Sequence, residues 1–252
     1  MKKFFAFLLF LSSFLNAGDY LWIYCGVTMK KPIKEMAREF EKFHPGVKVR
    51  HLFGSSGVLF RKLMRAKRAD LYLPGSPKFY KKAPELFSKK AVIGYNQLAI
   101  FTQKANPKHI KSLEDFKRSD VRIGLGDAHS SVGKAAKDTL IRYGGEKFYN
   151  YVRKRAKIYF ASPELVSALR ANEVDTDLNW RAVYFWGDNR NYVELIPLPT
   201  EFAPKKPLIL SVTSFSKHKD LANQFLEFAS SKKGQEIMAK WGFSNSRRNH
   251  RP

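Results

Sequence analysis

Cysteine is almost absent from this sequence, because Cys25 is the single one among 252 residues. A lone cysteine excludes an internal disulfide framework and a metal site built from several cysteines. The six histidines do not follow any spacing that is typical of metal ligands. We therefore expect a protein that holds no cofactor and no metal ion through its own side chains.

Acidic residues are also scarce, with 22 Asp and Glu against 46 Lys and Arg, so the formal net charge is +24. An excess of this size is typical of proteins that bind nucleic acid or anionic membranes. The basic residues are nevertheless spread along the chain and mostly fall on the polar side of helical patterns, as on a solvated face. We therefore predict no nucleic-acid partner and keep adhesion to anionic surfaces as an alternative function.

Long apolar runs are missing, apart from one short run near the N-terminus. Lys2 and Lys3 precede an apolar run from Phe4 to Phe14, and a short polar segment then ends at Ala17. This order is typical of a secretory signal peptide, and the run is too short for a transmembrane helix. We expect cleavage near Ala17 and a periplasmic protein, with a retained membrane anchor as the alternative.

Complete motifs of known catalytic sites are missing. The segment Gly54-Ser55-Ser56-Gly57 is one residue short of the Gly-x-Ser-x-Gly turn that carries a hydrolase nucleophile. Gly133-Lys134 lacks both the earlier glycine and the following Ser or Thr of a phosphate-binding P-loop. We therefore expect no enzymatic activity, since the alternative of an exported hydrolase has no recognisable set of catalytic residues.

The sequence does contain a regular alternation of strand-like and helix-like segments. The first part predicts strands at 20–25, 47–53 and 69–73 and helices at 32–43 and 58–67. The second part predicts strands at 98–102, 121–124 and 157–160 and helices at 133–143, 148–155 and 163–171. A strand at 208–212 and one or two helices within 221–241 follow. This alternation predicts an α/β protein with parallel strands covered by helices.

Two extended segments, 94–97 and the proline-rich 195–207, divide the chain into two lobes. We expect a first lobe formed by 18–97 and 200–246 and a second lobe formed by 98–199, between the signal peptide at 1–17 and a basic tail at 247–252. Each lobe would contain a mixed, mostly parallel sheet flanked by helices. A ligand would then bind in the cleft between the lobes.

Small hydroxyl residues stand where strands give way to helices, namely Thr28, Ser55, Ser56, Ser131 and Ser162. Helix N-termini present unpaired N–H groups and a partial positive charge, and hydroxyls add donors without adding charge. Helix capping explains each position taken alone, for instance Ser162 as the N-cap ahead of Pro163. Four such turns, two in each lobe and all at the carboxyl ends of strands, favour an anion site in the cleft.

The same residues carry a family resemblance. Thr28 ahead of a helix, the run 53–63 and the strand 69–73 resemble the periplasmic molybdate-binding proteins of ABC importers, and so do the segments 126–133 and 234–243. The likeness covers residues 20–243. It implies a two-lobed, type II periplasmic binding fold that closes on molybdate or tungstate, so that the metal would be bound as an oxyanion. It also implies a monomer that delivers the ion to a membrane permease, with sulfate or phosphate as the alternative ligand.

The resemblance further implies which groups would donate hydrogen bonds to the ion. Thr28 and Ser56 would donate through their hydroxyls, and Val132 and either Leu165 or Val166 through backbone N–H groups. At Asn179-Trp180-Arg181 the sequence departs from the family, in which a Val-Tyr pair is more usual, so the amide of Asn179 and the indole of Trp180 are both open as the last donor. The expected ligand-binding residues are Thr28, Ser55, Ser56, Ser131, Val132, Leu165, Val166, Asn179 and Trp180.

Four further residues have more than one interpretation. Asp70 and Asp127 could accept a proton from a protonated oxyanion such as hydrogen phosphate, or they could cap the ends of strands. Arg181 would add a positive charge if it lay in the site. Trp186 could belong to the site or pack in the core or hinge.

Overall fold

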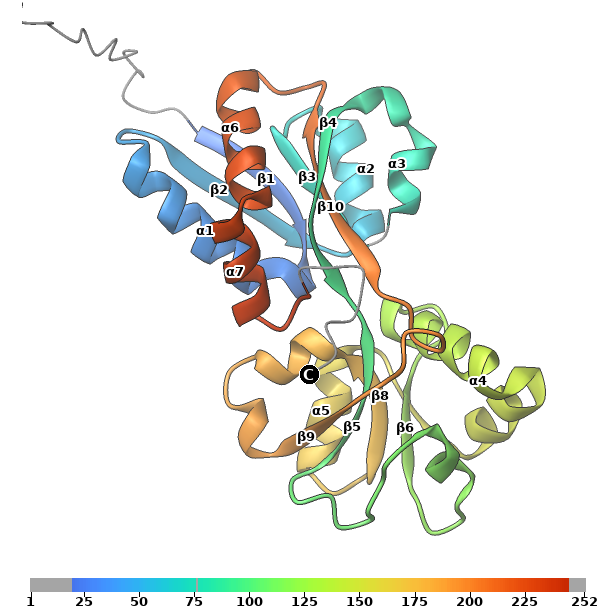
Figure 1. Cartoon of the computed structure of the whole chain (residues 1–252). Coiled ribbons are helices and arrows are strands. Elements are labelled where there is room, and N and C mark those ends of the chain that lie inside the picture. Colours follow the sequence, from blue (N-terminus) through green and yellow to red (C-terminus); the bar gives the residue numbers. More distant parts are fainter. Residues whose placement is uncertain (1–19, 76, 245–252) are drawn as a thin grey trace, which may run out of the picture.

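The fold is described by a computed structural model of residues 20–75 and 77–244. The predicted signal peptide at 1–17 and basic tail at 247–252 lie outside the described residues. Figure 1 shows two lobes joined by extended segments. Each lobe contains a mixed sheet flanked by helices, which confirms the predicted two-lobed α/β architecture. Among the described residues, no helix has the length and apolar character that crossing a membrane requires.

The first lobe is built on a sheet with the strand order β2-β1-β3-β10-β4. β1 pairs in parallel with β2 and β3, whereas β10 pairs antiparallel with β3 and β4. The elements are β1 (Tyr20–Gly26), α1 (Lys30–Phe43), β2 (Lys48–Gly54), α2 (Ser56–Ala66), β3 (Leu71–Leu73), α3 (Lys78–Lys82), β4 (Phe87–Asn96), β10 (Lys206–Thr213), α6 (Lys219–Ser230) and α7 (Lys232–Lys240).

Side chains of β1 alternate between the two faces of this sheet. Ile23 and Cys25 pack in a core with residues of α1, α6 and α7. Tyr24 packs on the opposite face, with Leu59 and Leu63 of α2. Because side chains of a strand alternate with a period of two, burial on both faces fixes the register of β1 and directs its end at Gly26 toward the second lobe.

The second lobe repeats this plan with the strand order β7-β6-β8-β5-β9. β6 pairs in parallel with β7 and β8, whereas β5 pairs antiparallel with β8 and β9. The elements are β5 (Leu98–Gln103), β6 (Ile123–Gly126), α4 (Ser131–Arg155), β7 (Lys157–Tyr159), α5 (Ser162–Arg170), β8 (Thr176–Trp180), the 3-10 helix η4 (Arg181–Phe185) and β9 (Val193–Pro197).

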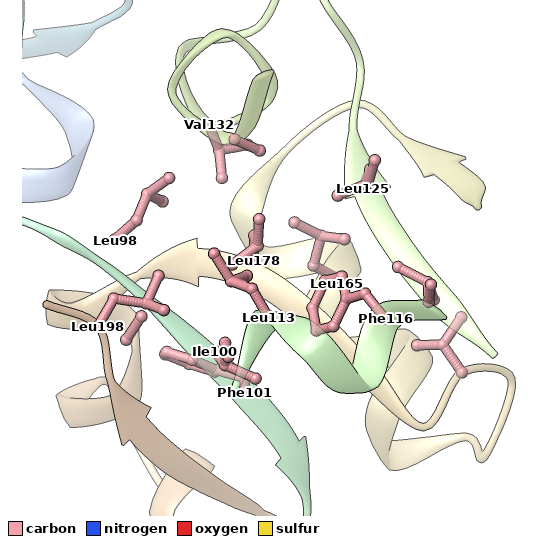
Figure 2. Close-up of a cluster of buried hydrophobic side chains, with 14 of the residues drawn as sticks. Leu98, Ile100, Phe101, Leu113, Phe116, Leu125, Val132, Leu165, Leu178 and Leu198 are labelled. Carbon is pink, nitrogen blue, oxygen red and sulfur yellow. The ribbon is translucent and has the colours of Figure 1, made fainter. Parts of the chain in front are cut away.

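Figure 2 shows the core of the second lobe, where Leu165 of α5 and Val132 of α4 lie over β8 and β5. Leu165 and Leu178 are fully buried. Burying a leucine side chain stabilises a fold by roughly 1.5–3 kcal/mol. These contacts therefore fix the starting points of α4 and α5 against the sheet.

The lobes are connected where β4 passes into β5 and where β9 passes into β10. Only Gln97 separates β4 from β5. Its side-chain amide donates to the carbonyls of Leu198 (3.1 Å) and Ala203 (2.7 Å), which lie on the other connection. Hydrogen bonds thus connect the two crossing segments to each other. The lobe limits at 18–97, 98–199 and 200–246 stay our proposal.

Several elements differ from the sequence-based expectation. The strands β4, β8 and β9 were not predicted, and antiparallel pairings equal parallel ones among the described strands because β10 and β5 run against their neighbours. The two predicted helices at 133–143 and 148–155 are confirmed, because non-helical Gly144 and Gly145 (φ of Gly145 is +76°) divide α4 into two helical parts. The prediction of Ser162 as an N-cap is wrong, since Ala161 is the N-cap of α5 and Ser162 is its first helical residue.

Candidate functional site

A cleft of about 330 Å³ is lined by residues of both lobes. The first lobe contributes the ends of β1, β2 and β3, and the second lobe contributes the starts of α4 and α5 together with Trp180 and Trp186. Among the described residues that line it, none is Lys, Arg, His, Asp or Glu. In a protein with a net charge of +24, the cleft therefore lacks ionic groups and has no side chain that titrates near neutral pH.

Ser56 lies at the start of α2, on the first-lobe wall of the cleft. Its Oγ accepts a hydrogen bond from the backbone N–H of Gly75 (3.0 Å). Because a serine hydroxyl has one proton, an oxygen that already accepts from Gly75 leaves that proton free to donate to a ligand. The neighbouring Ser55 is the N-cap residue of α2 but makes no side-chain cap hydrogen bond, so its hydroxyl is also not used in capping.

Thr28 lies in the 3-10 helix η1 (Val27–Met29), which links β1 to α1. Its hydroxyl donates to the Met29 sulfur (2.9 Å), which is a weak acceptor. Gly26 precedes it and allows β1 and β3 to end close together, since a Cβ at Gly26 would come within 3.1 Å of the Gly75 nitrogen. Thr28, Ser55 and Ser56 thus line one wall of the cleft, and their contact with a ligand stays a prediction.

The start of α4 forms part of the opposite wall. Ser130 is its N-cap and accepts from the N–H of Gly133 (3.0 Å), which leaves the N–H groups of Ser131 and Val132 without an intrahelical acceptor. A Cβ on Gly133 would lie 1.9 Å from the carbonyl oxygen of Asp127. Glycine is therefore required where α4 begins against the end of β6.

The start of α5 differs from the prediction. The N–H of Leu165 already donates to Ala161 O (3.3 Å), and the side chains of Leu165 and Val166 are buried in the lobe core. Neither residue lines the cleft. The cleft is lined instead by residues 160–163, because α5 starts at Ser162 and places the expected positions one turn too far along the helix.

Asn179 and Trp180 separate into two roles. Asn179 is fully buried, with its amide donating to Ser162 O (3.0 Å) and accepting from Trp180 N–H (2.9 Å), so it supports the start of α5 and does not line the cleft. Trp180 does line it. Arg181 turns away, since its Nη1 donates to Gly242 O (2.6 Å), and it adds no charge to the cleft.

Val27 and Phe160, which the sequence did not indicate, complete the lining together with Trp186, for which a site role was one of two interpretations. Phe160 and Val27, which come from opposite lobes, are 78% and 49% exposed and give the cleft apolar walls. Trp186 lines the cleft as well, and its indole Nε1 is buried without a partner among the described residues. The proline at 163, which marks the start of a helix, was the signal that could have placed residues 160–162 here.

The two aspartates with open interpretations do not lie in the cleft. Asp70 accepts from Trp22 N–H (2.8 Å) and from the Ser216 hydroxyl (2.7 Å), and it precedes β3 at the end remote from the second lobe. Asp127 accepts from the N–H of His129 (2.8 Å). Both carboxylates thus cap backbone or hydroxyl groups. Within the described part of the chain, no group of three or more His, Cys, Asp or Glu could hold a metal ion.

Two curated proteins are similar to the chain along most of its length. A protein of Haemophilus influenzae, named only as a binding protein, is 26% identical over 235 residues, which cover 91% of this chain and 92% of the relative. A Bacillus subtilis protein named as an ABC transporter substrate-binding lipoprotein is 22% identical over 232 residues, covering 89% and 86%.

Solved structures show the same fold. The substrate-binding domain of a protein named as a molybdenum ABC transporter of Clostridium difficile has a TM-score of 0.78 at 20% identity, covering 91% of this chain and all of that one. The sulfate-binding protein SubI of Mycobacterium tuberculosis has a TM-score of 0.74 at 18% identity, covering 89% and 86%. The periplasmic molybdate-binding protein of Azotobacter vinelandii has a TM-score of 0.70 at 14% identity, covering 88% and 98%.

A family model decides the relationship beyond the fold, since it matches nearly all of the described residues, from 21 to 244. Its members are described as extracellular solute-binding proteins of bacteria. The chain belongs to the family of bacterial extracellular solute-binding proteins.

Proposed function

We propose that this protein is the substrate-binding component of an ABC importer and captures a tetrahedral oxyanion, molybdate or tungstate, between its lobes. The observation that carries the proposal is the cleft itself, in which uncharged hydroxyl and N–H donors face one another from the two lobes. The similarity to proteins named for molybdenum and molybdate supports the choice of ion.

An ion of this kind needs donors and no acceptor, because it is fully deprotonated. The hydroxyl of Ser56, oriented by Gly75, and the N–H groups at the start of α4 supply donors from opposite sides. Closure of the lobes would replace water around the ion by these fixed dipoles. The apolar side chains of Val27 and Phe160, one on each lobe, would then exclude water from the mouth of the cleft.

Phosphate and sulfate are the alternative ligands, and the lining disfavours phosphate. At neutral pH phosphate carries a proton, which needs an acceptor. The two carboxylates considered for that task, Asp70 and Asp127, bind other groups outside the cleft. Sulfate is fully ionised and fits the same donors, so the relative affinities for sulfate and molybdate have to be measured.

Calorimetric titration of the protein with molybdate, tungstate, sulfate and phosphate tests the proposal. We expect the two metal oxyanions to bind most tightly and phosphate most weakly. Affinity should change little across neutral pH, because the lining has no group that titrates there. Absence of heat and of a thermal shift with all four ions would overturn the oxyanion proposal.

Delivery to the membrane completes the proposed function. The remaining expectations are an exported, periplasmic monomer, cleaved near Ala17, that hands its ion to a permease. The excess of positive charge on the protein surface would raise the rate at which an anion is captured, an effect that weakens with salt. Partial charges of helix starts, and not this net charge, would hold the ion in the cleft.

A further inference from the structure

A second concave surface lies on the first lobe and shares no described residue with the cleft between the lobes. It consists of two adjoining hollows of about 530 and 570 Å³ that share Trp22, Ala66 and Arg68. The start of β1, the end of α2 and the connection from β10 to α6 form its walls. Each hollow is larger than the cleft between the lobes.

Basic side chains from separate parts of the sequence gather at this surface, which we call the basic groove. The cations that line it are Lys62, Arg65, Lys67, Arg68 and Lys217, and Arg50 adjoins it over the ring of Tyr20. Within the described part of the chain, none of these six forms an ion pair. The expectation from the sequence, that most basic residues are spread over solvated helix faces, leaves room for a local group of this kind. The acid that lines the groove is Asp70, which is buried and already accepts two hydrogen bonds.

Aromatic rings hold two of these arginines in place. The guanidinium of Arg50 lies 3.8 Å from the centroid of the Tyr20 ring, and that of Arg68 lies 5.5 Å from Trp22. Lys67, which ends α2 in a left-handed conformation with φ of +46°, turns the chain so that Arg68 reaches Trp22. The groove thus combines an aromatic floor with a rim of cations, a combination suited to the interface between water and a lipid headgroup layer.

Charge and chain position limit what can cover the groove. A second copy of this chain would bring the same positive charges together, so the occupant must be anionic. Tyr20, which lies in the groove and is 40% exposed, follows Phe14, the end of the apolar N-terminal run, by six residues. The groove therefore includes the first residue that the structure describes, close in sequence to the predicted cleavage site near Ala17.

We propose that the basic groove binds the anionic phospholipid surface of the membrane. This contact would hold the receptor near the bilayer independently of the ion in the cleft, because no described residue lines both the groove and the cleft. Each basic side chain near an anionic surface strengthens binding by roughly fivefold, and the contribution falls with salt.

Co-sedimentation with lipid vesicles tests this proposal, using protein recovered from the periplasmic extract. The vesicles contain about 30% phosphatidylglycerol in phosphatidylcholine, or phosphatidylcholine alone, at roughly physiological salt. The double variant Arg65→Gln/Arg68→Gln removes two cations of the groove, and Lys147→Gln/Lys154→Gln removes two exposed cations of α4 in the second lobe. A second groove variant, Lys62→Gln/Lys217→Gln, leaves the arginine that contacts Trp22 intact.

We expect binding to the anionic vesicles only, with a loss of about thirtyfold in both groove variants and little change in the α4 variant. Equal losses in all three variants would show a general effect of net charge and overturn the proposal. Equal binding of the protein to neutral and anionic vesicles would also overturn the proposal. The protein could also fail to bind any vesicle but be retained on immobilised polyglutamate. If the groove variants lost this retention, the result would overturn the lipid proposal and assign the groove to an acidic polypeptide.

Discussion

The two lobes present donors of different kinds to the same cleft. In the first lobe the hydroxyls of Ser55 and Ser56 are not used for helix capping, and Ser56 is oriented by Gly75. In the second lobe the hydroxyl of Ser130 caps the N–H of Gly133, and backbone N–H groups at the start of α4 are donors beside the Ser131 hydroxyl. A side-chain donor can be removed by one substitution, whereas a backbone donor can only be displaced by disturbing the packing behind it.

The largest effect should therefore come from the packing behind the second-lobe donors. Gly133→Ala places a Cβ about 1.9 Å from the carbonyl of Asp127, and no flexible side chain can give way there. We expect a loss of about 3 kcal/mol or more in the free energy of unfolding, together with loss of ion binding. Urea unfolding and calorimetry measure the two effects.

Gly57→Ala is the matched control for that substitution, because Gly57 lies in the first turn of α2 in the other lobe. A Cβ there would meet only the side chains of Arg61 and Phe79, at 3.7 and 3.8 Å. Alanine favours a helix over glycine by about 1 kcal/mol, so this variant should be as stable as the natural protein or slightly more stable. Equal stability of both variants would mean that β6 and α4 are not in tight contact.

The next effect separates a ligand donor from a structural cap. Ser56→Ala should weaken binding of the ion by about 1–3 kcal/mol, or roughly 5- to 150-fold, because a buried anion loses a donor. Ser130→Ala should instead cost about 1 kcal/mol of stability through loss of the N-cap, with a smaller change in affinity. Unchanged affinity in Ser56→Ala would show that the first-lobe wall does not contact the ion.

Sequence reasoning placed these donors because their positions follow local rules. A small hydroxyl residue between a strand end and a helix start fixes the place of Thr28, Ser55, Ser56 and Ser131 without knowledge of the rest of the fold. It failed at α5, where an offset of a few residues moved the expected donors from the cleft to the core.

Features that depend on tertiary contacts were not visible in the sequence. β8 reads Thr-Asp-Leu-Asn-Trp, and its polar residues are all buried, so its composition does not indicate a central strand. β4 lies at a sheet edge and exposes Ser88 and Lys89, which interrupts the apolar pattern of a strand. The basic groove draws its cations from β2, α2 and a distant loop, and only the fold brings them together.

A pH effect distinguishes two acids of the second lobe. Asp177 is fully buried, neither carboxylate oxygen has a partner among the described residues, and burial raises its pKa well above the usual range. The folded state then holds a proton that the unfolded state releases, so stability is present at low pH and falls as pH rises toward the folded pKa. Asp177→Asn should raise Tm at pH 8 and change little at pH 4.

Asp175, two residues away, is the control with the opposite sign. Burial raises the pKa of Asp175, but hydrogen bonds from Arg122 outweigh burial and lower the pKa overall. Arg122 donates from Nη2 to Oδ1 (2.6 Å) and from Nε to Oδ2 (3.1 Å) of Asp175. Asp175→Asn should therefore lower Tm at pH 8 and have less effect in acid, where the carboxylate would be protonated. The same pH profile for both variants would contradict this distinction between the two carboxyl groups.

The smallest effect should come from the first lobe, where a buried titratable group without a partner is a base. The Nε2 of His51 is buried without a partner among the described residues, and burial, followed by the nearby Lys34, lowers the pKa of His51 to about 4. The unfolded state then binds a proton more readily between pH 6.5 and 4, so the stability supplied by the neutral ring is lost as pH falls through this range. His51→Gln should therefore reduce the acid-induced loss in the free energy of unfolding, which is followed as Tm against pH. We expect a reduction of only about 1 kcal/mol, because solvent screens the half-buried ring. His129→Gln, at an exposed position in the second lobe, should leave the profile unchanged. An unchanged profile in His51→Gln would place the acid sensitivity of the protein elsewhere than in this ring.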